Sequence, residues 1–192
     1  MISPFSLPAV LRIRDDEFVL YLSTEQLRTR IMELAARIDR DMQGKEAVFL
    51  CLLNGAFIFC ADLLRCLTID CEVEFLKLSS YGEENISSGD VRLVKDLCMD
   101  VENRHVVIVE DIVDTGYSID FVKKHLEKKN PASLKIVTLL HKPACTRIAH
   151  ELDYVGFEIP PRFVVGFGLD YARKARNIPA IYISKSDAIT YE

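Results

Sequence analysis

The most regular feature of the sequence is a set of short runs in which apolar residues follow one another almost without interruption. Three such runs are Ala47–Leu53, His105–Glu110 and Leu134–Leu140. A strand of a parallel sheet is covered by helices on both faces, so it needs apolar side chains on both. The runs therefore predict three central strands, and Val73–Leu78 predicts a further one.

Between these runs, apolar residues recur at the three- and four-residue spacing of a helix. Ser23 and Gln26 form a capping-box pattern, which predicts a helix that begins there and ends at Gly44. Further helices are predicted from Phe57 to about Leu67 and after Ser118. The apolar positions that define the first and last of these helices are Leu27, Ile31, Leu34, Ile38 and Met42, and Ile119, Val122 and Leu126.

Buried strands that alternate with helices predict an α/β fold with a mainly parallel sheet flanked by helices. A length of 192 residues fits one such domain. In sheets of this kind, ligands bind beyond the carboxyl ends of the strands. Three predicted strand ends carry candidate site residues, and these are Leu53–Gly55, Glu110-Asp111 and His141-Lys142.

One stretch between predicted strands has a different character. Ser79–Gly89 is polar and flanked by glycine, which predicts a mobile loop. Val91–Lys95, which follows it, is the candidate for the returning strand.

Charge and composition narrow the possible partners. The net charge of −5 and the pI of about 5.5 give no general attraction for nucleic acid or anionic membranes. No signal peptide is indicated at the N-terminus, and the longest apolar run is too short to span a bilayer. The six cysteines show no metal-binding spacing, which favours buried, reduced thiols. We expect a cytoplasmic protein with small-molecule partners, without nucleic acid or membrane.

The strongest chemical signal is the run Val106–Ser118. Glu110 and Asp111 are adjacent carboxylates at a predicted strand end, where they can bind ribose hydroxyls or a hard cation. The run Asp114–Ser118 places small residues and free amides at a helix N-terminus, which suits a phosphate group. The alternative is that Asp114 or Thr115 only caps the helix. The apolar run before the paired acids and the amphipathic helix after them favour the functional interpretation.

The run Glu110–Gly116 resembles the phosphoribosyl-pyrophosphate motif of the type I phosphoribosyltransferases, and the chain more narrowly resembles the hypoxanthine–guanine phosphoribosyltransferases. The resemblance extends from about Arg14 onward. It implies one domain over residues 1–192, with a core of about 24–150 and a small hood lobe from about 1–22 and 155–192. The further runs that carry it are Leu53–Gly55, Ser80-Tyr81, Leu140–Lys142, Asp153–Pro160 and Phe163–Tyr171.

The resemblance implies a role for each matching residue. Asp114 would be the general base that faces the purine imidazole nitrogen. Glu110 and Asp111 would hold the ribose hydroxyls with Mg²⁺ nearby, and Asp170 would be a further metal ligand. The other donor-binding residues would be Thr115, Gly116, Tyr117 and Ser118 around the 5′-phosphate, and Leu53, Asn54, Gly55 and Arg176 around pyrophosphate, with a cis peptide after Leu53.

For the purine base, the resemblance implies that Lys142 donates to the 6-oxo group and that Phe163 stacks on the ring. The Val164 backbone would contact the purine edge, and Asp170 would help to bind the base. Ser80 and Tyr81 would lie on a lid over the site. Hypoxanthine is the expected base, with guanine next and xanthine less favoured, and a homodimer or homotetramer is the expected assembly.

Two positions depart from the family pattern. Asn54 and Tyr117 stand where many relatives carry lysine, in the pyrophosphate loop and the phosphate loop respectively. Both loops bind largely through backbone amides, so the activity does not depend on these lysines alone. The affinity for the donor is the property that these departures would alter.

Other interpretations remain open for the chain and for single residues. A regulator that binds nucleotides or RNA on the same fold, and a magnesium-dependent phosphohydrolase, are the alternatives to the transferase. Lys142, Phe163 and Arg176 taken singly fit a solvated lysine, a core aromatic and an exposed basic face. The four histidines show no catalytic pairing in the sequence, and no role is predicted for them.

Overall fold

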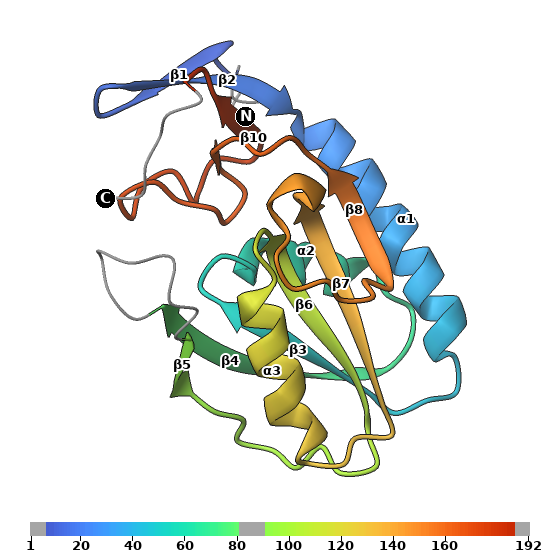
Figure 1. The fold of residues 1–192 in the computed structure, drawn as a ribbon. Helices are drawn as coiled ribbons and strands as arrows, with labels where there is room; N and C mark the ends of the chain where they lie inside the picture. Colours follow the sequence, from blue (N-terminus) through green and yellow to red (C-terminus); the bar gives the residue numbers. More distant parts are fainter. Residues whose placement is uncertain (1–6, 81–90, 187–192) are drawn as a thin grey trace.

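The main body of the molecule is a six-stranded sheet with the strand order β5-β4-β3-β6-β7-β8 (Figure 1). The computed structural model describes residues 7–80 and 91–186. The neighbours β4-β3-β6-β7-β8 pair in parallel, and only β5 is antiparallel, at the edge. The strands are β3 (Ala47–Leu53), β4 (Cys71–Ser80), β5 (Val91–Lys95), β6 (His105–Val113), β7 (Ser133–His141) and β8 (Tyr154–Glu158). The predicted α/β fold is confirmed.

Helices cover both faces of this sheet (Figure 1). On one face, α1 (Thr24–Met42) and α2 (Phe57–Cys66) enclose the larger apolar core with β3, β6 and β7. On the other face, α3 (Tyr117–Glu127) packs through Ile119, Val122 and Leu126 on the smaller core. The capping box at Ser23 is formed, and the predicted apolar face of α1 is buried. In residues 7–80 and 91–186, no helix is long and apolar enough to cross a membrane.

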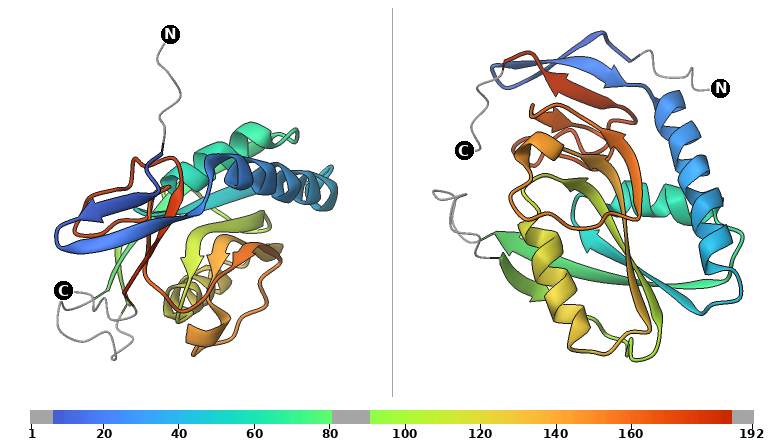
Figure 2. Two further views of the ribbon diagram at one scale, coloured as in Figure 1. Left: turned by 90° about the horizontal axis from the view of Figure 1, so that it is seen from above. Right: turned by 45° about the vertical axis from the view of Figure 1, so that its right-hand side comes forward.

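The second sheet is small and antiparallel, with the order β1-β2-β10-β9, and it forms the hood (Figure 2). Its strands are β1 (Val10–Ile13), β2 (Asp16–Leu22), β9 (Val164–Val165) and β10 (Ile181–Ser184). Phe18, Val165 and Tyr182 are central in its apolar core. A hood from terminal segments is thus confirmed, whereas the division at about residue 155 stays a prediction; β8 lies in the six-stranded sheet.

One predicted boundary was wrong, and it affects the site. The sequence pattern ended the strand at Glu110 and placed Asp111 in the turn, but β6 continues to Val113. Ile112 and Val113 pair with Leu140 and His141 of β7, so the ladder extends past the two carboxylates. The interstrand hydrogen bonds that decide this length are not visible in the apolar pattern of one strand.

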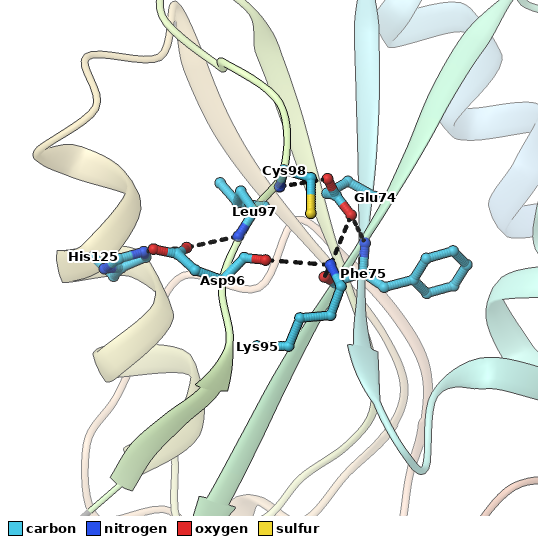
Figure 3. Close-up of polar contacts among 7 residues, drawn as sticks. All are labelled: Glu74, Phe75, Lys95, Asp96, Leu97, Cys98 and His125. Atoms are coloured by element: carbon cyan, nitrogen blue, oxygen red, sulfur yellow. Dashed lines mark hydrogen bonds and ion pairs between the residues drawn. The ribbon is translucent and has the colours of Figure 1, made fainter.

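A cluster of polar residues fastens the edge strand β5 to its surroundings (Figure 3). Glu74 on β4 is buried, and its carboxylate accepts hydrogen bonds from Phe75 N at 2.7 Å and Cys98 N at 2.8 Å. Lys95 Nζ lies 3.1 Å from the same carboxylate. Just beyond, Asp96 Oδ1 lies 2.8 Å from His125 Nε2 of α3. The end of β5 is therefore held both to β4 and to α3.

The predicted loop lies mostly outside the described residues. Ser79 and Ser80 are the last residues of β4, and the strand Val91–Lys95 returns as predicted. Tyr81, the second predicted lid residue, lies outside the described part of the chain.

Candidate active site

The carboxyl ends of the parallel strands and the hood together enclose a cavity of about 380 Å³. This volume falls within the usual range of small-molecule sites. The sheet side is formed by the end of β6, the loop that follows it and Lys142 after β7. From the hood come Phe163, Val164, Asp170 and Arg176. The predicted site residues among its lining are Gly55, Glu110, Asp111, Asp114, Thr115, Gly116, Ser118, Lys142, Phe163, Val164, Asp170 and Arg176.

Glu110 and Asp111 bring two buried carboxylates to the floor of this cavity. Each is 8% exposed. Burial, followed by the neighbouring Asp111 charge, raises the pKa of Glu110 well above its ordinary value. Burial also raises the pKa of Asp111, although a side-chain hydrogen bond with Glu110, a hydrogen bond from Ile112 N at 2.9 Å and the charge of Arg176 act in the opposite direction. The negative charge of the two carboxylates is therefore only partly compensated by nearby donors and cations, and a bound cation would compensate the rest.

Glycine at position 55 is required by this arrangement. A β-carbon there would lie 1.7 Å from Asp111 Oδ2. The backbone of the loop after β3 therefore packs directly against the carboxylate. The peptide bond between Leu53 and Asn54 in this loop is cis, as the family resemblance implies.

Asp114 and Lys142 form an ion pair at the cavity wall, with 2.8 Å between Asp114 Oδ2 and Lys142 Nζ. The side chain of Lys142 is 4% exposed, and that of Asp114 is 30% exposed. A lysine on a solvated surface would not be buried to this extent, so Lys142 does not fit the alternative of a solvated surface lysine. The pair places a proton acceptor and a proton donor side by side on the cavity wall.

The loop between β6 and α3 lines the cavity together with the first residues of α3. The N-cap of α3 is Gly116, with φ at 88°, and no side-chain hydrogen bond caps the helix. A β-carbon at Gly116 would lie 2.3 Å from the carbonyl oxygen of Ile148, so this position needs glycine. Because the N-terminal amides of α3 are left without a side-chain cap, they are suited to bind an anion.

A second hollow of about 210 Å³ lies next to the first. Its lining includes Leu53, Asn54 and Gly55, and it shares Glu110 and Asp111 with the main cavity. Gly55 lines both hollows, so the loop Leu53–Gly55 lies next to the two carboxylates. Close packing of Gly168 on the carbonyl of Gly55 connects this loop to the hood.

The hood residues are held mainly by one another. Arg176 lies 2.6 Å from Asp170 and donates to the carbonyl of Gly168 at 2.7 Å. The second oxygen of Asp170 accepts from Arg173 N at 2.7 Å. Phe163 lines the cavity and also contacts Phe18 and Tyr171, with ring centroids 6.3 Å and 5.6 Å away. Within residues 7–80 and 91–186, no group of three acidic, His or Cys side chains forms a metal-binding cluster.

The predicted phosphate-loop residue Tyr117 does not line the main cavity. It lies on a groove along α3 with Phe121 and His125. Ser80, the first predicted lid residue, is the last residue of β4. The irregular segment after Lys142 was not predicted to belong to the site, although its Thr146 and Ile148 contact the loop before α3. This segment has neither periodicity nor a turn signature, so no sequence pattern could have placed it against that loop.

Comparison with known sequences places these features in a family. The family of the phosphoribosyl transferase domain matches residues 21–172. A hypoxanthine phosphoribosyltransferase from Haemophilus influenzae is 44% identical over 167 residues, covering 85% of this chain and 92% of that protein. A hypoxanthine-guanine phosphoribosyltransferase from Mycobacterium bovis is 40% identical over 177 residues, covering 89% and 87%.

Solved structures agree with this placement. A hypoxanthine phosphoribosyltransferase from Staphylococcus aureus superimposes with a TM-score of 0.83 and 38% identity, covering 86% of this chain and 90% of that one. A hypoxanthine-guanine phosphoribosyltransferase from Bacillus anthracis gives 0.82 and 41%, covering 85% and 96%. Another similar structure, from Trypanosoma cruzi, is a complex with its substrates, with a TM-score of 0.81, 39% identity and coverage of 86% and 94%.

Proposed function

We infer the reaction from the family to which this chain belongs, the phosphoribosyltransferases, and within it the hypoxanthine–guanine phosphoribosyltransferases. The enzyme transfers the 5-phosphoribosyl group of phosphoribosyl pyrophosphate to a 6-oxopurine in purine salvage. The bond from the ribose anomeric carbon to pyrophosphate breaks, and a bond from that carbon to a purine imidazole nitrogen forms. The products are a nucleoside 5′-monophosphate and pyrophosphate, and the purine N–H proton is released.

One observation carries the proposed assignment of roles. A single cavity combines uncapped helix amides, two buried carboxylates and the Asp114–Lys142 pair. Each of these features suits a different part of the two substrates. The amides suit the 5′-phosphate, the carboxylates suit ribose hydroxyls, and the pair suits a base with one N–H and one carbonyl oxygen.

At the purine, Asp114 accepts the imidazole proton while Lys142 donates a hydrogen bond to the 6-oxo group. Their side-chain atoms are 2.8 Å apart, so one edge of the base that carries both an N–H and the 6-oxo group contacts both of them. Phe163 covers one side of the base, and the Val164 backbone reads its edge. A general base of this kind typically accelerates a reaction by about 10²–10⁴-fold.

At the ribose, Glu110 and Asp111 hold the hydroxyls close to the carbon that develops positive charge. Thr115, Gly116 and Ser118 bind the 5′-phosphate through backbone amides and hydroxyls, with Tyr117 contributing its amide at the start of α3. The loop Leu53–Gly55 and Arg176 hold the pyrophosphate. These contacts fix the reacting atoms relative to one another, which lowers the entropic cost of the reaction.

The described cavity residues fit a requirement for Mg²⁺. The lining carries four carboxylates and two cationic side chains, Lys142 and Arg176. An anionic donor would be repelled by this excess of negative charge. Bound Mg²⁺ would neutralise the charge on the leaving group, and Mg²⁺ sites commonly use one or two carboxylates with substrate phosphates. Glu110 and Asp111 would be these carboxylates; for Asp170 to join them, its bond to Arg176 would have to open.

Assembly and location are proposed on separate grounds. We propose a homodimer or homotetramer, because Phe57, Val73, Phe75 and Val94 are exposed large apolar side chains that a second copy would cover. Sedimentation velocity would test it. We propose a cytoplasmic location, supported by six free cysteines, since reduced thiols are typical of that compartment.

The direct test offers hypoxanthine, guanine, xanthine and adenine separately with phosphoribosyl pyrophosphate and Mg²⁺. We expect nucleoside monophosphate from hypoxanthine first and guanine second, and loss of turnover on chelation. A folded protein that turns over none of the four bases would contradict the proposal. Binding of RNA at physiological salt in that case would favour the regulator instead.

A further inference from the structure

The segment after Lys142 lies against the loop that carries Asp114, the proposed general base. Pro143–Cys145 forms one turn of 3₁₀ helix, and the chain then runs beside the end of β6. Arg147 N and Ile148 N both donate to the carbonyl of Thr115, at 3.0 Å and 3.1 Å. The carbonyl of Ile148 occupies the space beside Gly116. Two stretches that are about thirty residues apart in sequence are therefore packed backbone to backbone.

The hydroxyl of Thr146 is at the centre of this contact. Its Oγ1 lies 3.1 Å from the carbonyl oxygen of Lys142 and 3.3 Å from that of Asp114. The third neighbour is His141 Nε2, at 3.2 Å. A hydroxyl has one proton and two lone pairs, so it donates to the carbonyls and accepts from His141 in the Nε2–H tautomer. One hydroxyl thus reaches the main chain of both members of the Asp114–Lys142 pair.

This contact matters because Asp114 and Lys142 come from the ends of different strands. Asp114 follows β6 and Lys142 follows β7, and a backbone hydrogen bond from Lys142 N to Val113 O at 2.9 Å joins the two ends. Beyond that bond, the two main chains are joined by the backbone bonds to Thr115 and by the hydroxyl of Thr146. Thr146 is the side chain that contacts both carbonyls there.

We propose that Thr146 is a positioning residue for the transfer, with His141 orienting its hydroxyl from behind. It touches no substrate, and it holds the main chain of Asp114 and Lys142 at the spacing that the purine requires. The inference rests on the proposed roles of that pair. A residue that only closed the 3₁₀ turn would contact Lys142 O alone and would not affect turnover.

The decisive comparison is between Thr146→Val, which keeps the shape and removes the hydroxyl, and Thr146→Ser, which keeps the hydroxyl. We expect Thr146→Val to lower kcat by about five- to tenfold, the scale of one net hydrogen bond. The KM for phosphoribosyl pyrophosphate should stay within about twofold, because the amides of Arg147 and Ile148 still hold Thr115. Thr146→Ser should restore kcat to within about twofold of the wild type.

Two outcomes would overturn the inference: kcat of Thr146→Val within about twofold of the wild type, or equal losses in the valine and serine variants. If Thr146→Val fails to fold, the pair His141→Leu and His141→Gln decides, because only glutamine keeps a side-chain donor. Leucine should lower kcat and glutamine should not; equal values would contradict the proposal. Wild-type turnover in the same assay distinguishes the two proposals. An inactive wild type would contradict both the transferase function and the role of Thr146. An active wild type with unaffected variants would contradict only the role of Thr146.

Discussion

Two regions of the molecule contain buried carboxylates whose pKa values are shifted in opposite directions. Glu74 is 9% exposed, and Glu110 and Asp111 are each 8% exposed. At Glu74, burial raises the pKa, but hydrogen bonds from Phe75 N, Cys98 N and Lys95 outweigh it and hold the pKa below the ordinary value (Figure 3). At Glu110, burial and the adjacent Asp111 raise the pKa instead.

The difference lies in how completely each carboxylate is satisfied. Glu74 has three donors within 3.1 Å, whereas Glu110 and Asp111 each accept from the backbone amide of the following residue and otherwise share a side-chain hydrogen bond with each other. A satisfied buried carboxylate stabilises the fold. A buried carboxylate with few donors costs stability, and such groups cluster at functional sites. Burial alone therefore does not distinguish a structural acid from a functional one; the count of donors does.

The largest expected effect is at the third carboxylate of the cavity. Asp114→Asn should lower kcat by about 10²–10⁴-fold, because the amide cannot accept the purine proton. The melting temperature should stay near that of the wild type. The matched control is Asp120→Asn on α3, whose carboxylate pairs with the exposed Lys124. Undiminished turnover in Asp114→Asn would remove this residue as the general base.

The reverse pattern is expected at Glu74. Glu74→Gln should lower the free energy of unfolding by about 2 kcal/mol, because the amide loses charge-assisted bonds and turns a donor toward other donors. The kcat of the folded variant should remain within about twofold of the wild type. Urea denaturation and steady-state kinetics measure the two quantities. A large fall in kcat at unchanged stability would break the distinction between the two regions.

A smaller effect is expected at the partner of Asp114. Lys142→Ala should raise the KM for the oxopurine about tenfold, equivalent to about 1.4 kcal/mol, because the donor to the 6-oxo group is lost. The KM for phosphoribosyl pyrophosphate should change by less than about twofold. Lys124→Ala, on the exposed face of α3, serves as the control. Equal increases in both KM values would undermine the assignment of Lys142 to the base.

The smallest expected effect is a change in how the stability of the protein depends on pH. A carboxyl with a raised folded-state pKa binds a proton more readily in the folded protein, so its destabilising contribution grows as pH rises from about 4.3 toward that pKa. Glu110→Gln should therefore raise the free energy of unfolding of the ligand-free protein at about pH 7.5, by on the order of 1 kcal/mol. This gain should shrink as the pH is lowered.

The contribution of Glu74 to stability should depend on pH in the opposite direction. Its lowered pKa contributes stability above the unfolded value of about 4.3, and that contribution is lost as the pH falls through the folded-state pKa. Glu74→Gln should thus cost most at neutral pH and less in acid. Melting curves of both variants without magnesium between pH 4 and 7.5, roughly the range around these values, would test it. Parallel pH profiles would refute the contrast.

By itself, the sequence determined the α/β class, the central strands and the part of the chain that carries the site. These follow from local causes: apolar runs, helical spacing, a capping box at Ser23 and the acids and glycine of Glu110–Gly116. The resemblance added roles for residues such as Lys142 and Phe163. Their joint presence in one cavity was not readable from spacing, because Phe163 lies on the part of the hood that follows β8, whereas Lys142 follows β7 of the main sheet.

Only the tertiary structure decided how each acid is used. The donors that satisfy Glu74 include Cys98 N and Lys95, more than twenty residues away, so the sequence showed a glutamate in a strand and nothing more. The continuation of β6 to Val113 depends on its pairing with β7, and the position of Thr146 depends on an irregular segment that packs on another loop. Periodic patterns in the sequence indicate which residues face the core and which face solvent. Hydrogen bonds between distant segments form only when the fold brings particular atoms within about 3 Å.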